Sequence, residues 1–224
     1  MRDIPVFTVP SGIATLILRE IPPRGEAYVL LRGVFTSQEE LLTECARFCR
    51  AAGAERVYYG GADVHADGAA YATLLPRSIL RTALPPTGAL AVPIRPDEAD
   101  EWQRLYRERF RSVPAAASVC DARGACFVVE GGRRIGLGAV SGDTLRAVAA
   151  LERGRGADCV CALAALAQGE RLRLTCAAEN RSAMRLYDRL GFDAGEAVER
   201  WYAFSENGAE TTGAAEEKIR ICPL

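Results

Sequence analysis

Short apolar runs alternate with polar turns in the first third of the chain, a pattern typical of strands joined by tight loops. Residues 12–20 and 26–35 are rich in Ile, Val, Leu and Thr and predict two strands. Pro22, Pro23 and Gly25 lie between these runs and predict a hairpin loop.

A helix is expected next, because Thr36 and Glu39 have the spacing of a capping box. The helix is expected to run to about residue 52, where Gly53 ends it, and residues 56–60 predict another strand. We interpret residues 61–70 as a loop. The apolar segment 71–81 fits neither a strand nor a helix uniquely.

The rest of the chain also alternates between apolar residues at helical spacing and apolar runs typical of strands. Apolar residues spaced as on one helix face mark a helix capped by Asp97, with Asp100 at the capping-box position; they are Trp102, Leu105, Tyr106, Phe110 and Val113. Further helices are expected at residues 112–118, 157–168 and 180–190. Strands are expected at residues 90–95, 125–130, 133–140, 144–151, 171–177, 196–204 and 217–223.

A domain boundary is predicted in the segment 82–88, where Pro85 and Pro86 cannot continue regular structure. The expected domains are residues 1–85 and 86–224. The segments AAGAERVYYG (51–60) and LAQGERLRLTC (166–176) indicate a weak internal repeat, since both place a glycine and then Glu-Arg before an apolar strand. Chance similarity between two α/β units explains the same likeness.

Composition narrows the class of protein. The 224 residues are 49% hydrophobic and 25% charged, close to the average of globular proteins. The formal net charge of -1 gives no general attraction to nucleic acid or to anionic membranes. No apolar run reaches the ~18–20 residues of a membrane span. Asp3 and Pro5 argue against a signal peptide, so we expect a cytoplasmic protein.

The cysteines and the single histidine do not suggest a metal centre. The eight cysteines form no pair of CxxC motifs, and we expect them to be mostly buried thiols without a bound metal. His65 lies in a glycine- and alanine-rich stretch and is interpreted as a solvated loop residue.

Two segments carry candidate chemistry. The first, Arg153-Gly154-Arg155-Gly156-Ala157, lies between a predicted strand and a predicted helix. Glycines allow a tight backbone turn, and the amides of a helix N-terminus attract anions, so the segment predicts a pyrophosphate cradle. It is neither a Walker loop nor a Rossmann fingerprint. A plain basic turn would have the same sequence.

The second segment runs from Asn180 through Ala183, Leu186 and Tyr187 to Phe192. An amphipathic helix with Asn180 as its N-cap and Tyr187 as a core residue explains the spacing alone. That interpretation does not explain why this helix follows a glycine-arginine loop, a helix and a strand.

Together the two segments resemble the GNAT superfamily of N-acetyltransferases. The loop is similar to the family's R/Q-x-x-G-x-G/A motif, with Arg153 and Gly156 in register, and Val148 occupies the family's hydrophobic position five residues earlier. Residues 178–192 resemble the pattern N-x-x-A-x-x-L-Y-x-K/R-x-G-F at every defined position. The resemblance covers about residues 90–224. It implies an α/β (α+β) fold, a twisted mixed sheet flanked by helices whose two central strands splay apart to admit acyl-CoA.

The resemblance also implies roles for individual residues. Backbone groups of Val148 and Ala150 would bind the pantetheine arm, which Asn180 would support, and the amides of residues 154–158 would hold the pyrophosphate. Tyr187 would protonate the departing CoA thiolate, a role suited to a phenol with an ordinary pKa near ~10. The implied acetyl-CoA contacts are Val148, Ala150, Arg153, Gly154, Arg155, Gly156, Ala157, Asp158, Asn180, Ala183 and Tyr187.

The sequence departs from the family pattern at Asp158, where the family has Gly or Ala. A carboxylate beside a pyrophosphate is unfavourable unless it points away. No general base is singled out either: Glu130, Glu152, Glu179 and free solvent all remain candidates.

The N-terminal segment 1–85 is interpreted as a degenerate, partial GNAT-like domain that packs against the catalytic domain and shapes the acceptor pocket. Glu39 and Glu40 fall in the first turn of its helix and would oppose a bound phosphate. The expected activity is transfer of acetyl from acetyl-CoA, as cosubstrate, to a primary amine of a small molecule, with a peptide amine as the second candidate acceptor. The alternative is a non-catalytic acyl-CoA-binding module. No nucleic-acid or membrane partner is expected, and the sequence leaves the oligomeric state open.

Overall fold

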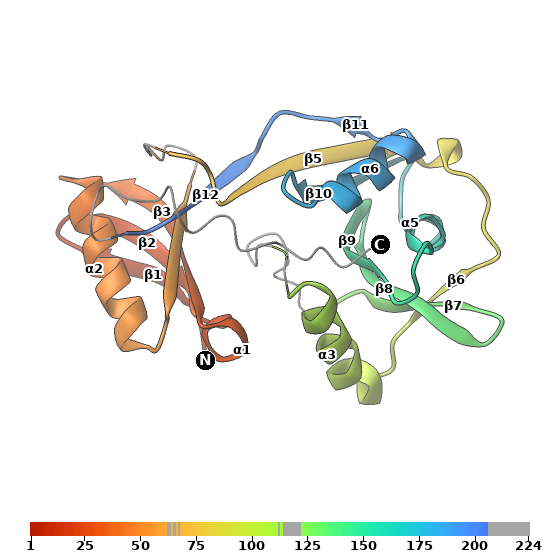
Figure 1. Ribbon diagram of the computed structural model, residues 1–224, viewed down its shortest axis with the longest axis horizontal. Coiled ribbons are helices and arrows are strands. Elements are labelled where there is room, and N and C mark those ends of the chain that lie inside the picture. Colours follow the sequence, from red (N-terminus) through yellow and green to blue (C-terminus); the bar gives the residue numbers. More distant parts are fainter. Residues whose placement is uncertain (62–63, 65, 67, 112, 114–121, 206–224) are drawn as a thin grey trace. The chain divides into compact units, whose positions relative to one another are not determined.

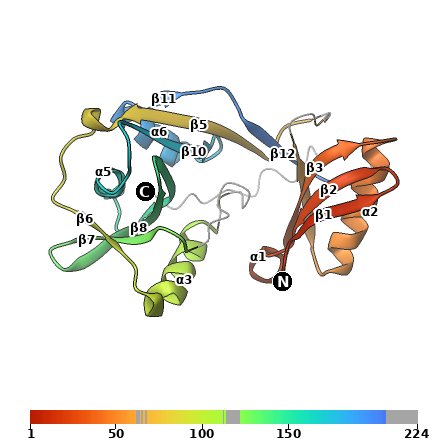
Figure 2. The same ribbon diagram turned by 180° about the vertical axis from the view of Figure 1, so that it is seen from behind.

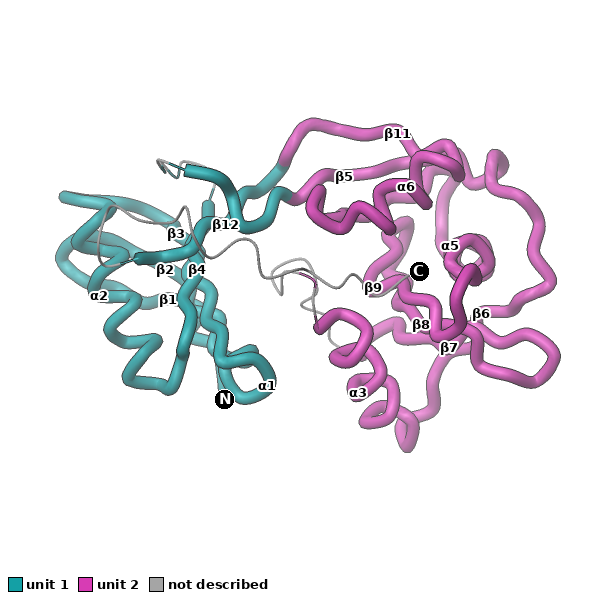
Figure 3. Tube along the Cα trace, in the orientation of Figure 1, with its two compact units in different colours: residues 1–73, 198–218 teal, residues 74–197, 219–224 magenta. Residues whose placement is uncertain are grey.

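The computed structural model divides the protein into two compact units. Unit 1 comprises Met1–Thr73 and the segment that starts at Val198, and unit 2 comprises Leu74–Ala197 (Figure 3). The structure describes residues 1–61, 64, 66, 68–111, 113 and 122–205. His65, Cys120, Cys222, most of the expected helix at 112–118 and the expected strand at 217–223 lie outside the described residues.

Unit 1 is a mixed sheet with a long helix on it (Figure 1). Its elements are β1 (Ile4–Val9), β2 (Gly12–Ile17), α1 (Ile21–Arg24), β3 (Glu26–Val34), α2 (Gln38–Ala51), β4 (Arg56–Gly60) and β12 (Glu199–Ala203). The strand order is β1-β2-β3-β4-β12, and only the β3–β4 pair is parallel. The helix α2 connects the parallel pair and packs its buried face, which includes Leu41, Cys45 and Cys49, against the sheet.

Three local features of unit 1 differ from the sequence prediction. The N-cap of α2 is Ser37, whose hydroxyl accepts a hydrogen bond from the Glu40 backbone N–H at 3.3 Å, and not Thr36. The short helix α1 replaces the expected hairpin loop, because prolines fit the first turn of a helix. The edge strand β1 was not predicted.

Unit 2 contains the remaining strands, which again form both parallel and antiparallel pairs. Its elements are β5 (Ala72–Leu80), η1 (Arg81–Ala83), β6 (Leu90–Pro93), η2 (Pro96–Glu98), α3 (Ala99–Arg109), β7 (Ala125–Glu130), β8 (Arg133–Ser141), β9 (Thr144–Ala150), α5 (Gly156–Ala164), β10 (Arg171–Ala177), α6 (Arg181–Leu190) and β11 (Asp193–Ala194). The strand order is β5-β10-β9-β8-β7-β6, and β11 also pairs with β5. The β9–β10 pair is parallel, and the other pairs given for this unit are antiparallel.

Helices cover both faces of the unit 2 sheet (Figures 1 and 2). Alternate residues of β7 show the division, because Ala125 and Phe127 pack with Trp102 of α3, whereas Cys126 and Val128 pack in the cluster that includes α5 and α6. The helix α5 ends at Ala164, four residues before the expected end. The ambiguous segment 71–81 is the strand β5.

The expected boundary between residues 85 and 86 lies inside unit 2, whereas the change of unit falls within β5. The reason is that most of β5 pairs with a strand of unit 2: Leu74 to Leu80 lie opposite Ala177 to Arg171 of β10. Pro85 and Pro86 therefore interrupt the chain between two elements of the same unit.

The two units share the same strand–helix–strand connectivity, and each also contains one strand from the other half of the sequence. Each contains a parallel pair joined by a helix, β3-α2-β4 in unit 1 and β9-α5-β10 in unit 2. The repeated segments 51–60 and 166–176 fall at similar places: the first begins at the last residue of α2, the second begins two residues after α5, and each continues into the strand that follows. Next to the second parallel strand, unit 2 holds β5 from the first part of the chain, and unit 1 holds β12 from the last part.

Candidate functional site

The central strands β9 and β10 separate along their length. Their pairing consists of Arg173 opposite Thr144, at the beginning of both strands, although the structure describes every residue of each. Ala147 has a φ of 52°, and the register of β9 against β8 shifts at this point. Val148 and Ala150 follow this bulge, where β9 has already left β10. The sheet thus opens toward its Ala150 and Ala177 ends, as the resemblance implies.

The glycine-arginine loop lies between the open end of β9 and α5. Gly154 has a φ of 83°, a left-handed conformation that favours glycine, and a side chain added there would meet no atom within 4 Å. Arg155 is the N-cap of α5, and Gly156, Ala157 and Asp158 form its first turn. The first amides of a helix have no partners within it, so this turn presents hydrogen-bond donors and the positive end of the helix dipole.

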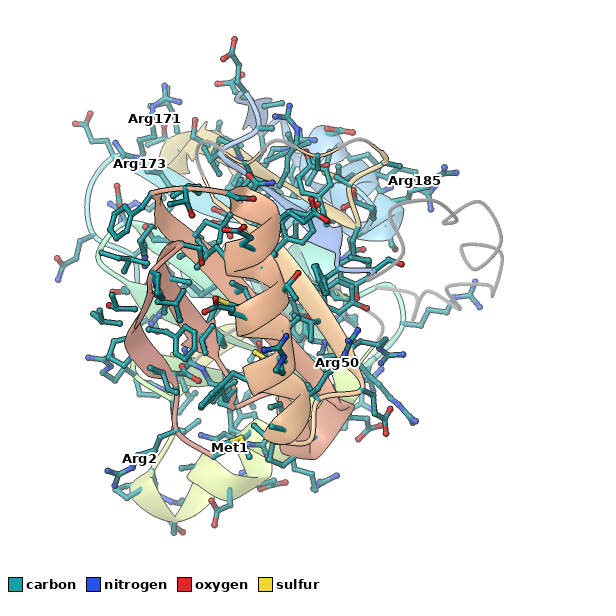
Figure 4. All side chains as sticks on the ribbon, turned by 90° about the vertical axis from the view of Figure 1, so that its left-hand side faces the viewer. Met1, Arg2, Arg50, Arg171, Arg173 and Arg185 are labelled. Atoms are coloured by element: carbon teal, nitrogen blue, oxygen red, sulfur yellow. The ribbon has the colours of Figure 1, made fainter. Side chains whose placement is uncertain are left out.

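A cavity of about 290 Å³ lies between this loop and α6. It is lined by Gly154, Gly156, Ala157, Ser182, Arg185, Leu186, Arg189 and Leu190. Arg185 and Arg189 are exposed, one helical turn apart, and neither forms an ion pair with another described residue. Figure 4 shows the Arg185 side chain extending outward from α6. The cavity therefore combines a helix N-terminus with two available guanidinium groups, which suits a phosphate group.

The loop arginine Arg155 does not contribute its side chain to this cavity. Its guanidinium pairs with the Glu130 carboxylate and, through Nε, with Asp158 Oδ2 at 3.0 Å. The other oxygen of Asp158 accepts a hydrogen bond from Thr87 Oγ1 at 3.0 Å. The Asp158 carboxylate is thus neutralised and held by its neighbours, so its presence does not conflict with an anion in the cavity.

Sequence reasoning missed Arg185 and Ser182 as lining residues, and it counted Arg189 only as a position of the family pattern. The available signal was the spacing of Arg181, Arg185 and Arg189 at four-residue intervals, which places a row of cations on one side of a helix.

The helix α6 begins and ends as its sequence predicts. The side chain of Asn180 accepts a hydrogen bond from the Ala183 backbone N–H at 3.2 Å, and Gly191 closes the helix in a left-handed conformation. Ala183, Leu186 and Tyr187 are buried on its inner face. Asn180 therefore serves as the N-cap, with its backbone N–H donating to the Ala177 carbonyl at the open end of β10.

Tyr187 lies in the apolar cluster that also contains Ala150, Cys159 and Cys176. Its ring is tilted against that of Phe192, with ring centroids 5.3 Å apart. Burial raises the pKa of the Tyr187 phenol above its ordinary value, the nearby thiols of Cys176 and Cys159 raise it further, and Arg77 lowers it. The phenol is therefore protonated at neutral pH and can donate a proton.

The three candidate bases differ in their surroundings. Glu130 is engaged by Arg155, and Glu152 lies 3.5 Å from Arg133. Glu179 follows β10 by two residues and precedes α6, at the open end of the sheet. None of the three lines the cavity.

Other groups do not form an additional centre in the described part of the chain. Its six cysteines are buried, and burial raises the pKa of Cys45, Cys49, Cys159 and Cys176 to about 12. No group of three or more His, Cys, Asp or Glu residues among the described positions is arranged to hold a metal ion. No helix in the same ranges has the length and apolar character needed to cross a membrane.

Neither a protein-family model nor a curated protein matches the chain. Solved structures do match it. A conserved protein of unknown function from Staphylococcus epidermidis has a TM-score of 0.59 and 11% identity, over 88% of this chain and 92% of that one. A putative acetyltransferase from Pyrococcus horikoshii has a TM-score of 0.51 and 14% identity, over 88% and 70%. A GCN5-related N-acetyltransferase from Kribbella flavida has a TM-score of 0.51 and 15% identity, over 88% of both chains. At these identities the likeness concerns the fold, and the protein has a mixed α/β, GNAT-like fold.

Proposed function

We propose that the protein is an acyl-CoA-dependent N-acyltransferase that moves an acetyl group from acetyl-CoA to a primary amine of a small molecule. In this proposal the pyrophosphate lies in the cavity, held by Arg185, Arg189 and the amides of residues 154–158. Backbone groups of Val148 and Ala150, together with the Asn180 region, hold the pantetheine arm. The reacting thioester lies beside Tyr187.

One observation carries the proposal: the cationic cavity lies against the loop that leads out of the separated strands. If the pyrophosphate of CoA lies in the cavity, the pantetheine arm of CoA would extend toward the gap between β9 and β10, which begins after Arg173 and Thr144. The cavity also supplies donors of the right chemistry, since guanidinium groups and helix N-terminal amides both favour phosphate. The residues present therefore fit acyl-CoA.

Acyl-CoA supplies the activated acyl group, and the chain's own residues orient it and move the proton. The amine attacks the acyl carbon, and Tyr187 donates its proton to the departing sulfur. The apolar surroundings of Tyr187 keep the phenol protonated until that step. Glu179, Glu130, Glu152 and free solvent are the candidate acceptors of the proton that the amine loses.

A second candidate function is a non-catalytic acyl-CoA-binding module. The observation that favours it is the engagement of Glu130 and Glu152 by arginines, which leaves them poorly suited as bases. Calorimetric titration with CoA and a transfer assay over a panel of amines separate the two functions. The enzyme binds CoA and acetylates at least one amine, whereas the module binds CoA and acetylates none.

We also propose that unit 1 is a partial GNAT-like domain without a CoA site. Its α2 occupies the place that α5 has in unit 2, but Glu39 and Glu40 lie in the first turn. Carboxylates there stabilise the helix and repel phosphate. Titration of the whole chain is therefore expected to give one CoA site per molecule, and two equivalent sites would contradict this assignment.

A further inference from the structure

A buried arginine lies beneath the helix that carries Tyr187. Arg77 belongs to β5, opposite Leu174 of β10 and opposite Ala194 of β11, and it is only 4% exposed. Burying a guanidinium is unfavourable, and an apolar side chain at such a position is often neutral or stabilising. The position of Arg77 therefore calls for an explanation beyond packing.

Arg77 contacts α6 on both sides of Tyr187 in sequence, at Met184 and at Asp188. Its Nη1 donates a hydrogen bond to Asp188 Oδ1 at 2.8 Å, and its Nη2 contacts Met184 Sδ at 3.3 Å. Residues 184, 187 and 188 share one side of a helix because of the three- and four-residue spacing. The Arg77 guanidinium thus contacts both ends of the helical turn, residues 184–188, that contains Tyr187.

Asp188 only partly offsets the charge of Arg77. The Asp188 side chain is 58% exposed and so interacts with solvent, whereas Arg77 is buried and its Nε has no hydrogen-bond partner among the described residues. The other titratable groups that act on Tyr187 are the thiols of Cys176 from β10 and Cys159 from α5. Among these three groups, Arg77 is the one that favours the charged form of the phenol.

We propose that Arg77 is a positioning residue for proton transfer by Tyr187: it fixes the Met184–Asp188 turn and offsets the negative charge left on the phenol oxygen. The inference rests on the proposed function. In the step, the acceptor nitrogen bonds to the acyl carbon and the carbon–sulfur bond breaks with its electron pair going to sulfur. The sulfur takes the O–H proton of Tyr187, and the proton lost by the acceptor nitrogen restores the phenol through solvent.

The need for Arg77 follows from where this charge forms. A phenolate among Cys159, Cys176 and apolar side chains would be poorly solvated, so the proton would be given up reluctantly. A fixed cation favours the charged form without moving during the step. Because β5 comes from the first part of the chain, the N-terminal segment contributes a residue to the site of unit 2.

A double-mutant cycle tests this role. Arg77→Gln removes the charge and Arg77→Lys keeps it, and each is made in the wild-type and in the Tyr187→Phe background. Acetyl transfer is measured at saturating acetyl-CoA, with circular dichroism and thermal unfolding as controls for folding. We expect Arg77→Gln to lower kcat about 10-fold or more, a part of the ~10²–10⁴-fold typical of proton transfer, with little change in KM for acetyl-CoA. Arg77→Lys should retain kcat within about threefold of the wild type.

Comparing Arg77→Gln in the wild-type and Tyr187→Phe backgrounds shows whether Arg77 acts through the phenol. Arg77→Gln is expected to cause no further loss of kcat once Tyr187 is Phe, because its effect passes through the phenol. An equal loss in both backgrounds, or a loss in Arg77→Lys as large as that of Tyr187→Phe, would overturn the inference. The Arg77→Lys comparison stands even if the neutral variant does not fold. Unchanged kcat in Tyr187→Phe alone would instead refute the acid role of Tyr187 in the proposed function.

Discussion

The two arginines on α6 offer a direct test of where the phosphates bind. Replacing Arg185 and Arg189 by Gln removes both cations from the cavity and keeps good helix formers on an exposed face. Since both side chains are exposed, each contact with a phosphate is worth only about 1 kcal/mol, below the full range for charged hydrogen bonds. One such contact corresponds to about a fivefold change in Kd and two to about a thirtyfold change.

Calorimetric titration with CoA and with pantetheine makes the test specific. The double variant should bind CoA about thirtyfold more weakly, by the estimate of about 1 kcal/mol per contact, and pantetheine, which carries no phosphate, unchanged. The difference for CoA should shrink as NaCl is raised, because salt screens exposed charges.

A matched control is available on β10. Arg171 and Arg173 are exposed on the side of the strand opposite to its buried Leu172 and Leu174, and Figure 4 shows both side chains pointing outward. Changing both of them to Gln should leave CoA binding unaltered. Equal weakening by the control pair, or weaker binding of pantetheine by the α6 variant, would refute phosphate binding in this cavity.

Three further predictions concern the loop, the exchanged strands and the buried thiols. Gly156→Glu should abolish CoA binding in calorimetry, because it places a carboxylate in the cavity. Gly33→Glu, near the end of β3, should leave CoA binding intact, since a Cβ there meets no atom closer than 3.8 Å. Retained binding in Gly156→Glu would contradict the assignment. The fragment 86–224 lacks β5 and should not fold alone, as judged by circular dichroism. Co-expression with residues 1–85 should restore a folded complex. A stable fragment that binds CoA would refute the requirement of unit 2 for β5. The free energy of unfolding should fall as pH rises above ~9. Burial raises the pKa of Cys45, Cys49, Cys159 and Cys176 to about 12, so the unfolded chain loses these thiol protons at a lower pH than the folded chain. Denaturant titrations that show constant stability from pH 7.5 to 10 would contradict this.

Elements with a strong period were predictable from sequence. The hairpin of β7 and β8, the strand β10 and the helix α6 have apolar residues in clear alternation or at helical spacing, and the structure confirms their positions. The edge strand β1 was missed because Pro5 lies within it and Pro10 directly follows it, whereas an edge strand tolerates proline. The predicted domain boundary differed from the observed one because a proline pair predicts an irregular segment and does not determine which strands a neighbouring strand pairs with.

The candidate site was partly predictable for a related reason. The loop glycines and the cap and C-terminal glycine of α6 act locally, so their sequence positions determine their conformations. The direction of Arg155 depends on Glu130, which is 25 residues away, and the burial of Arg77 depends on a helix more than 100 residues later. Such pairings arise from the tertiary fold, and no local pattern encodes them.

Acetyl transfer by the wild type and by Tyr187→Phe, over a panel of small primary amines, tests the central claim most directly. The wild type should release CoA and form the amide with at least one amine. Tyr187→Phe keeps the ring volume, so CoA affinity and thermal stability should stay close to those of the wild type, while kcat falls by about 10²-fold or more. CoA binding without transfer to any amine, or full activity in Tyr187→Phe, would contradict the account.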